Sequence, residues 1–144
     1  MAEPLYQDLL LKHHKAPIGF ELSGEFTHSA EGENGGCGDE IFIKAVLSDV
    51  CIERISFSGD SCAICRASAS ILCQLTDGKP KQEVLQLIST VTEFLAVDLP
   101  SEQEHSILTI DSDLQALSSV RQYPVRLQCA QLPWNTLKQL VDNW

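Results

Sequence analysis

Residues 40–75 change from a strand-like to a helix-like pattern within a few positions. Two segments, Glu40–Leu47 and Cys51–Ser58, are rich in β-branched and aromatic residues and are joined by Ser48-Asp49-Val50, so we expect a β-hairpin. Gly59-Asp60-Ser61 then breaks the strand and offers N-cap side chains to a helix that contains Cys62–Leu75. Any fold of this chain must therefore accommodate a hairpin that leads directly into a helix, with Cys62 in the first turn of that helix.

The rest of the chain is mainly helical in pattern. Residues 18–38 are rich in Gly, Ser, Glu and Asn, lack any period and are predicted to form a loop, and Asp98–Thr109 has no clear pattern. We find no internal repeat and expect a single domain over residues 1–144. Apolar residues at helical spacing predict helices over Pro4–Lys15, Lys79–Leu95, Ser112–Gln122 and Val125–Asp142, the last with Pro133 near its start or at a kink.

Composition and charge exclude several classes of partner. Hydrophobic residues at 44% and charged residues at 21% are typical of a folded globular protein. The formal charge of −10 would repel the phosphate backbone of nucleic acids and anionic lipid, so we expect protein partners with basic patches, no nucleic acid and no membrane. No apolar run approaches the roughly 18 residues of a membrane span, and we expect a cytoplasmic protein.

The six cysteines are the main candidates for chemistry. A cytoplasmic chain with enough core needs no disulfides, so thiols or metal ligands are expected. Cys51 and Cys73 sit in apolar patterns and are interpreted as small buried residues. Cys62-x-x-Cys65 is the one recognised local pattern, and on a helix it fits either a redox pair or a core position for Cys65.

Cys62 is expected to be nucleophilic or a good metal ligand, because a thiol in the first turn of a helix faces unpaired N–H groups that favour the thiolate. Cys37 lies on a glycine turn, Gly35-Gly36-Cys37-Gly38, with Asp39 close by. Together with Cys129, these residues would supply three sulfurs and one carboxylate, a tetrahedral set suited to zinc or to an iron–sulfur cluster.

Four segments carry a family resemblance: LYQDLLLKHHKAP, CGDEI, SGDSCAICRASAS and LSSVRQYPVRLQCAQLPWNTL. In this order they resemble the conserved blocks of the SufU branch of the IscU/NifU N-terminal family. The resemblance implies an α+β fold, in which a small antiparallel sheet of about three strands packs against several helices, and a role in iron–sulfur cluster assembly. It also implies that Cys37 and Asp39 form the Cys-Gly-Asp motif, with Cys62 and Cys129 as the remaining ligands.

The branch decides the expected chemistry. The long interval from Cys62 to Cys129, and Gln128 where the IscU branch usually has histidine, resemble SufU. SufU-like proteins hold zinc and take sulfur from a SufS-like cysteine desulfurase, which makes Cys37 the expected sulfur acceptor. IscU-like proteins instead assemble iron as a [2Fe-2S] cluster and pass it to apoproteins. The chain is thus expected to be a sulfurtransferase-like carrier feeding a cluster-assembly complex or, alternatively, a non-enzymatic scaffold.

Four further positions are interpreted through the resemblance. Cys65 stands where serine is usual, and it is a possible alternative ligand or a disulfide partner that shuts the site. Arg126 matches a family arginine and is expected to shield the Cys129 thiolate. His13 and His14 lie at a helix end, on a block that usually faces partners, and are not expected to be ligands. A purely structural zinc module is the third possibility, which the exposed glycine turn disfavours.

Overall fold

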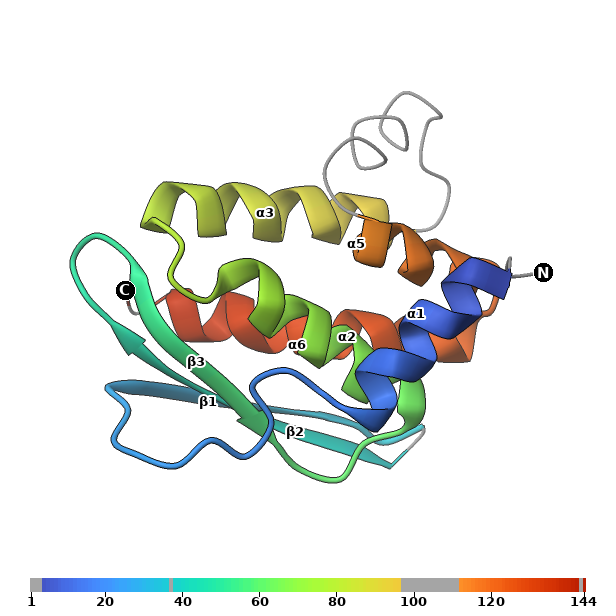
Figure 1. The fold of residues 1–144 in the computed structure, drawn as a ribbon, viewed down its shortest axis with the longest axis horizontal. Helices are drawn as coiled ribbons and strands as arrows, with labels where there is room; N and C mark the ends of the chain where they lie inside the picture. The colour runs from blue at the N-terminus through green and yellow to red at the C-terminus, as the bar shows by residue number, and fades with distance from the viewer. Residues whose placement is uncertain (1–3, 37, 97–111, 143) are drawn as a thin grey trace.

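The strand-like segments form a three-stranded antiparallel sheet in the order β1-β2-β3, and helices cover one of its faces (Figure 1). The computed structural model describes residues 4–36, 38–96, 112–142 and 144. The mixture of one antiparallel sheet with helices confirms the predicted α+β class. The elements are α1 (Pro4–Lys15), β1 (His28–Asn34), β2 (Asp39–Leu47), β3 (Ile52–Ser58), α2 (Ala63–Thr76), α3 (Lys81–Phe94), α5 (Ser112–Ala116), the 3-10 helix η1 (Leu117–Val120) and α6 (Pro124–Val141).

The core lies between the sheet and the helix pair α2 and α6. Alternate residues of β2 point inward, so that Ile41, Ile43 and Ala45 are buried while the residues between them face solvent. Trp134 of α6 is almost fully buried, and its indole Nε1–H donates to Ser68 Oγ of α2 at 3.1 Å. This bond joins the two helices that bring cysteines toward the sheet.

The prediction of a loop over residues 18–38 is wrong for residues 28–34, which form β1. The inward positions of β1 are small or polar, so the segment lacks the apolar alternation of an ordinary strand. Gly32 shows why: a Cβ at this position would lie 2.2 Å from Thr136 Oγ1 of α6. The side chains are small because α6 packs closely against the backbone of β1.

Several helices begin or end at other residues than the sequence predicts. Cys62 is the N-cap of α2 rather than part of its first turn. Residues 112–120 divide into the short α5 and η1 instead of one continuous helix. Pro133 lies in the interior of α6, far from its start, where it cannot supply the N–H that would reach the Cys129 carbonyl. The segment Asp98–Thr109 lies outside the described residues.

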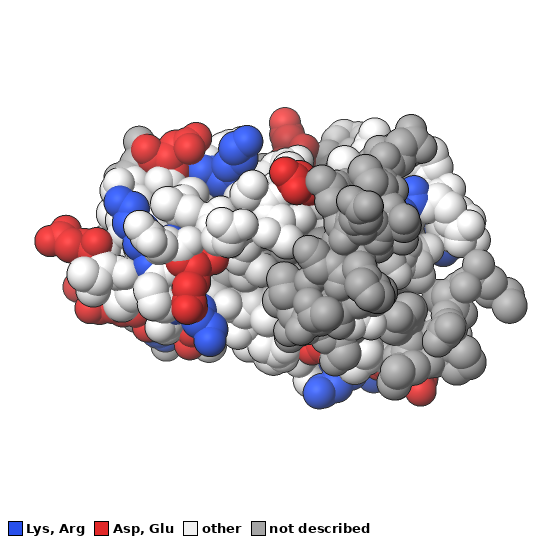
Figure 2. Space-filling view, turned by 90° about the horizontal axis from the view of Figure 1, so that it is seen from above, with Lys and Arg blue, Asp and Glu red and all other residues white. Residues whose placement is uncertain are grey.

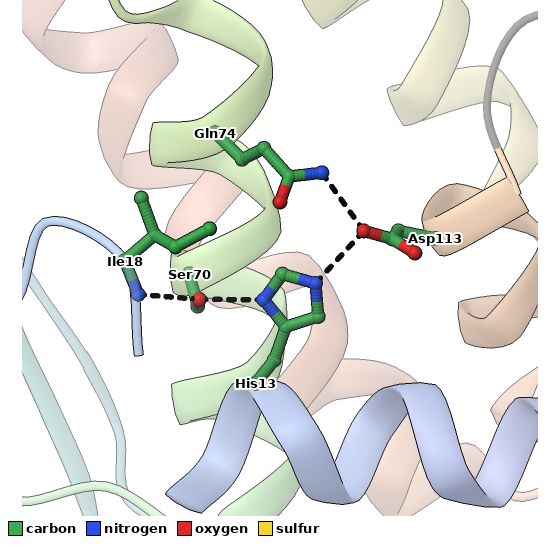
Figure 3. A network of polar contacts seen from close by, with 5 residues as sticks. All are labelled: His13, Ile18, Ser70, Gln74 and Asp113. Atoms are coloured by element: carbon green, nitrogen blue, oxygen red, sulfur yellow. Dashed lines mark hydrogen bonds and ion pairs between the residues drawn. The ribbon is translucent and has the colours of Figure 1, made fainter. Parts of the chain in front are cut away.

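A buried polar network joins α1, α2 and α5, and its centre is His13 (Figure 3). His13 is 1% exposed, its Nδ1 lies 2.6 Å from Ser70 Oγ, and its Nε2 lies 2.9 Å from Asp113 Oδ2. Gln74 donates to the same carboxylate oxygen at 2.8 Å, and the Ile18 N–H donates to Ser70 Oγ at 2.7 Å. The interpretation of His13 as a partner-facing residue is therefore wrong, because its ring fixes α1 on the helical layer.

Acidification should weaken this network. Burial raises the pKa of Asp113, but hydrogen bonds from His13 and Gln74, helped by the charges of His13 and Lys12, hold that pKa below its ordinary value. A lowered carboxyl pKa adds stability that is present above the unfolded value of about 3.9 and is lost as the pH falls through the folded value. Asp113→Asn should therefore flatten the acid limb of stability below about pH 5, as measured by urea unfolding. The exposed Asp8→Asn is the control, and an equal flattening in both variants would contradict the assignment.

The acidic excess is unevenly distributed. On the face that carries α3, acidic and basic side chains are intermixed, with uncharged surface between them (Figure 2). The solvent-facing side of the sheet, here called the outer sheet face, carries the exposed Glu31, Glu33 and Glu40, and Glu33 pairs with Glu40 across the strands. Within the described part of the chain, no helix has both the length and the apolar character needed to cross a bilayer.

Candidate metal centre

Three predicted ligands converge from distant parts of the sequence. Asp39 begins β2, Cys62 caps α2, and Cys129 lies in α6. One carboxylate oxygen of Asp39 and the two Sγ atoms all lie within 4.8 Å of one another, an arrangement that could hold a metal ion. Asp39 and Cys129 are each 2% exposed, whereas Cys62 is half-buried. The site is thus open to solvent on the side of Cys62.

Hydrogen bonds hold the Asp39 carboxylate against the start of α2. Its Oδ1 accepts the Cys62 backbone N–H at 2.7 Å, and its Oδ2 lies 3.7 Å from Cys62 Sγ. A buried carboxylate beside two thiols is costly unless a donor or a cation satisfies the remaining oxygen lone pairs. Two sulfurs and one carboxylate oxygen are also ligands that zinc accepts. The donor set therefore fits a metal ion.

Gly59 allows β2 and the start of α2 to meet. Its φ is +116°, and a Cβ added there would lie 2.3 Å from the carbonyl oxygen of Glu40. The next residue, Asp60, accepts the Glu40 N–H through its carbonyl at 2.8 Å. This close approach of the two backbones places Cys62, three residues after Gly59, next to Asp39.

Gly59→Ala should separate these ligands. In this variant, alanine would have an unfavourable φ, and its Cβ would clash with the backbone of Glu40. We therefore expect the free energy of unfolding to fall by at least about 1–3 kcal/mol. Zinc affinity should fall at the same time, because Cys62 can no longer lie beside Asp39. Urea unfolding and zinc titration would measure both effects. Gly78→Ala is the control for a positive φ (+74°) with no atom within 4 Å of the added Cβ, and an equal loss of zinc affinity in both variants would contradict this role.

Two further groups contact the sulfurs. The Cys65 N–H donates to Cys62 Sγ at 3.4 Å, and Asn34 Nδ2 donates to Cys129 Sγ at 3.9 Å. Asn34 ends β1 and pairs with Asp39. Sequence reasoning did not identify Asn34, although an Asn-Gly pair before an alternating segment is a strong hairpin signal.

Cys37 itself lies outside the described residues. Its described neighbours Gly36 and Gly38 belong to the connection between Asn34 and Asp39, the last pair of the β1–β2 ladder. Gly38 has a φ of +71° and no atom within 4 Å of an added Cβ. The connection that carries Cys37 therefore starts and ends next to the residues that contact Cys129 and Cys62.

On the expectation that Cys37 accepts sulfur, Gly38→Ala should slow sulfur transfer without displacing the metal. Alanine in the left-handed region costs roughly 1–2 kcal/mol, although the space around the residue is open. Gly36→Ala is the matched control in the same connection, since Gly36 has no positive φ and an added Cβ would meet only Asn34 Oδ1 at 3.5 Å. We expect a several-fold lower rate of persulfide transfer for Gly38→Ala at unchanged zinc content. Equal rates for the two variants would show that the conformation of Gly38 is not required.

Arg126 is exposed, and its guanidinium lies over the ring of Tyr123, 5.4 Å from the centroid. Its expected role beside Cys129 stays a prediction. Arg126 also lines a pocket of about 390 Å³, together with Leu10, His14 and Ile64. Ala63, the residue that follows Cys62, lines the same pocket.

The remaining described cysteines differ in their surroundings. Cys65 is 0% exposed and does not belong to the group formed by Asp39, Cys62 and Cys129. Cys73 is buried as predicted, and burial, together with the charge of Asp77, raises the pKa of its thiol. Cys51 is only half-buried, contrary to prediction, because it lies at the β2–β3 connection, where its Sγ is 3.5 Å from Ser48 Oγ.

Fold and site together define an α+β protein with a cysteine- and aspartate-lined candidate metal centre. Residues 5–137 match the family described as the NifU-like N terminal domain. The chain belongs to this family, which confirms the resemblance seen in the cysteine blocks.

Individual relatives agree with this assignment. The chain is 30% identical over 141 residues to the iron–sulfur cluster assembly scaffold protein IscU of Streptococcus pyogenes serotype M1, covering 96% of this chain and 84% of the relative. It is 28% identical over 141 residues to the zinc-dependent sulfurtransferase SufU of Bacillus subtilis strain 168, covering 96% and 90%. The similar proteins thus include one scaffold for cluster assembly and one zinc-dependent sulfurtransferase, the two functions considered from the sequence.

Solved structures confirm the fold. The N-terminal part of a nitrogen-fixing NifU-like protein from Brucella abortus superposes with a TM-score of 0.77 at 16% identity, covering 95% of this chain and 92% of that one. A structure described as an iron–sulfur cluster assembly scaffold for the SUF system of Fervidobacterium islandicum AW-1 has a TM-score of 0.73 at 25% identity, covering 92% and 93%.

Proposed function

We propose that this protein acts in iron–sulfur cluster assembly as a zinc-dependent sulfur carrier, which accepts persulfide sulfur from a cysteine desulfurase. The observation that carries the proposal is the convergence of Asp39, Cys62 and Cys129, whose donor atoms lie within 4.8 Å of one another. The connection that bears Cys37 begins and ends beside this group. The similarity to a zinc-dependent sulfurtransferase over nearly the whole chain supports the same chemistry.

Asp39, Cys62 and Cys129 would hold the metal, with Cys37 as the fourth ligand. Bound zinc keeps thiols deprotonated and ordered at neutral pH. The Cys62 N–H orients the Asp39 carboxylate, and Asn34 Nδ2 orients the Cys129 sulfur. These contacts orient three of the four proposed ligands. The fourth, Cys37, lies in the sequence between Asn34 and Asp39.

Cys37 is the proposed acceptor of sulfur. Its thiolate attacks the terminal sulfur of the desulfurase persulfide, the S–S bond of that persulfide breaks, and the desulfurase cysteine leaves as a thiolate. Cys37 then carries the new persulfide, and no oxidant is consumed. The half-buried Cys62, and the pocket lined by the next residue, Ala63, support an approach of the desulfurase from this side.

A second function, the assembly of a [2Fe-2S] cluster as cargo on the same residues, is favoured by the 30% identity to an IscU scaffold. In that case, the protein delivers clusters to apoproteins. Elemental analysis after anaerobic purification separates the two, since one equivalent of zinc supports the carrier and iron with labile sulfide supports the scaffold. Incubation with desulfurase and cysteine, followed by mass spectrometry, should then place extra sulfur on Cys37. Extra sulfur found only on Cys62, Cys65 or Cys129 would overturn the assignment of the acceptor.

A further inference from the structure

Cys62 immediately precedes α2, and Cys65 lies in the first turn of that helix. Cys62 is the N-cap, and its Sγ accepts the backbone N–H of Cys65 at 3.4 Å. The metal group does not include Cys65, and the bond from its N–H uses only its backbone. The proposed sulfur transfer does not use the thiol of Cys65.

The N-cap geometry brings the first sulfur within reach of the second cysteine. In the middle of a helix, residues three apart have Cβ atoms about 5–6 Å apart, which is longer than the roughly 3.5–4.5 Å of a disulfide. Cys62 is not helical: its φ of −68° and ψ of 169° fold the side chain back over the turn that follows. Because the Cys62 sulfur already contacts the Cys65 N–H, rotations about the side-chain bonds of the two cysteines are the movement that would bring the two Sγ atoms together.

The two thiols differ in access to solvent. Cys62 is half-buried, whereas Cys65 is 0% exposed. A small oxidant therefore reaches Cys62 first, and Cys65 is protected until a partner sulfur lies beside it. Cys73 lies in the same helix but is 1% exposed, and burial raises its thiol pKa, so this thiol stays unreactive.

We infer that Cys62 and Cys65 form a reversible intrahelical disulfide that removes Cys62 from the metal centre. A low-molecular-weight disulfide is the oxidant: the Cys62 thiolate attacks it, forms a mixed disulfide and releases one thiolate. Cys65 then attacks the Cys62 sulfur and passes its proton to the leaving sulfur, which releases the second small thiol. Two protein thiols are oxidised, and one small disulfide is reduced to two thiols.

The consequence for metal binding rests on the proposed function, in which Cys62 is a ligand. Loss of an outer contact already weakens metal sites by about 10–100-fold, so loss of a sulfur ligand should lower zinc affinity by more than about 100-fold. Bound metal should in turn slow the oxidation, because the Cys62 sulfur is then occupied. The Cys62 sulfur can therefore take part either in the disulfide or in metal binding, but not in both at once.

The test uses the full chain, metal-free, equilibrated in glutathione buffers from reducing to oxidising and then blocked with iodoacetamide. Trypsin releases residues 55–66 as one peptide that contains both Cys62 and Cys65. We expect this peptide to lose two hydrogen masses and to escape alkylation in the oxidising buffers, and dithiothreitol should reverse the change. Cys65→Ser should abolish the change, whereas Cys73→Ser, which alters a buried thiol of the same helix, should leave it intact.

Other linkages would overturn the inference. A dominant bond from Cys62 to Cys129 or Cys37, or no bond in oxidising glutathione, excludes the Cys62–Cys65 pair, while zinc binding by the reduced protein would leave the proposed function in place. If the Cys62–Cys65 bond forms and the oxidised protein still binds zinc with unchanged affinity, Cys62 is not a ligand. In that case, both the closure of the metal centre and the ligand set of the proposed function are wrong.

Discussion

Cys62→Ala should lose zinc binding and sulfur transfer together. The variant removes one sulfur of the proposed set and the N-cap acceptor that receives the Cys65 N–H. Because structural zinc sites contribute on the order of 10 kcal/mol of apparent binding energy, the remaining ligands should bind zinc too weakly to retain it through gel filtration. Metal content by elemental analysis and persulfide by mass spectrometry are the measurements, and Cys129→Ala should behave in the same way.

Cys51→Ala provides the control. This residue is a half-buried cysteine at the β2–β3 connection and is not part of the metal group. It should retain zinc content and transfer rate. Zinc retained at one equivalent in Cys62→Ala would remove Cys62 from the ligand set, whatever the activity.

Asp39→Ala should have the second largest effect. The carboxylate is 2% exposed and accepts the Cys62 N–H, so its removal deletes a ligand and leaves a donor without its acceptor. An unsatisfied donor of this kind costs about 1–3 kcal/mol of unfolding free energy. We expect turnover to be abolished, the metal to be destabilised and the midpoint of urea unfolding to fall.

Asp39→Asn separates the two roles of this side chain. Asparagine keeps an oxygen for the Cys62 N–H but has no charge to offer a cation. Stability should recover in this variant, while zinc affinity and transfer should stay low. Wild-type sulfur transfer in Asp39→Ala would mean that the aspartate only shapes the turn.

Much of the fold could be predicted from local patterns. The alternation in β2 and the signals before α2 placed the hairpin and the helix, because these segments bury one continuous apolar face. β1 could not be found in this way, since its inward residues are small enough for α6 to approach at Gly32. Asn34 was missed for the same reason, because it ends β1 and contacts Cys129 only after the strands have paired.

The site was predictable to a different extent. The three cysteine blocks and Asp39 pointed to one ligand set, and the structure brings together the three of its members that it describes. His13 was misjudged, because its partners Ser70 and Asp113 lie far away in sequence and no local pattern indicates a buried imidazole. The single-domain assignment over residues 1–144 and the role of Arg126 stay predictions.

The position of β1 also affects how this protein resists aggregation. A three-stranded sheet has two edges, and each could pair with a strand of another molecule. On β3, residues 19–21 cover the edge, with the Glu21 N–H bonded to the Phe57 carbonyl at 2.8 Å and the Phe57 N–H bonded to the Gly19 carbonyl at 2.9 Å. On β1, the exposed Glu31 and Glu33 would lie opposite each other if two copies paired antiparallel with residue 31 of one copy facing residue 33 of the other. These features of the two sheet edges therefore disfavour the addition of a strand from another molecule.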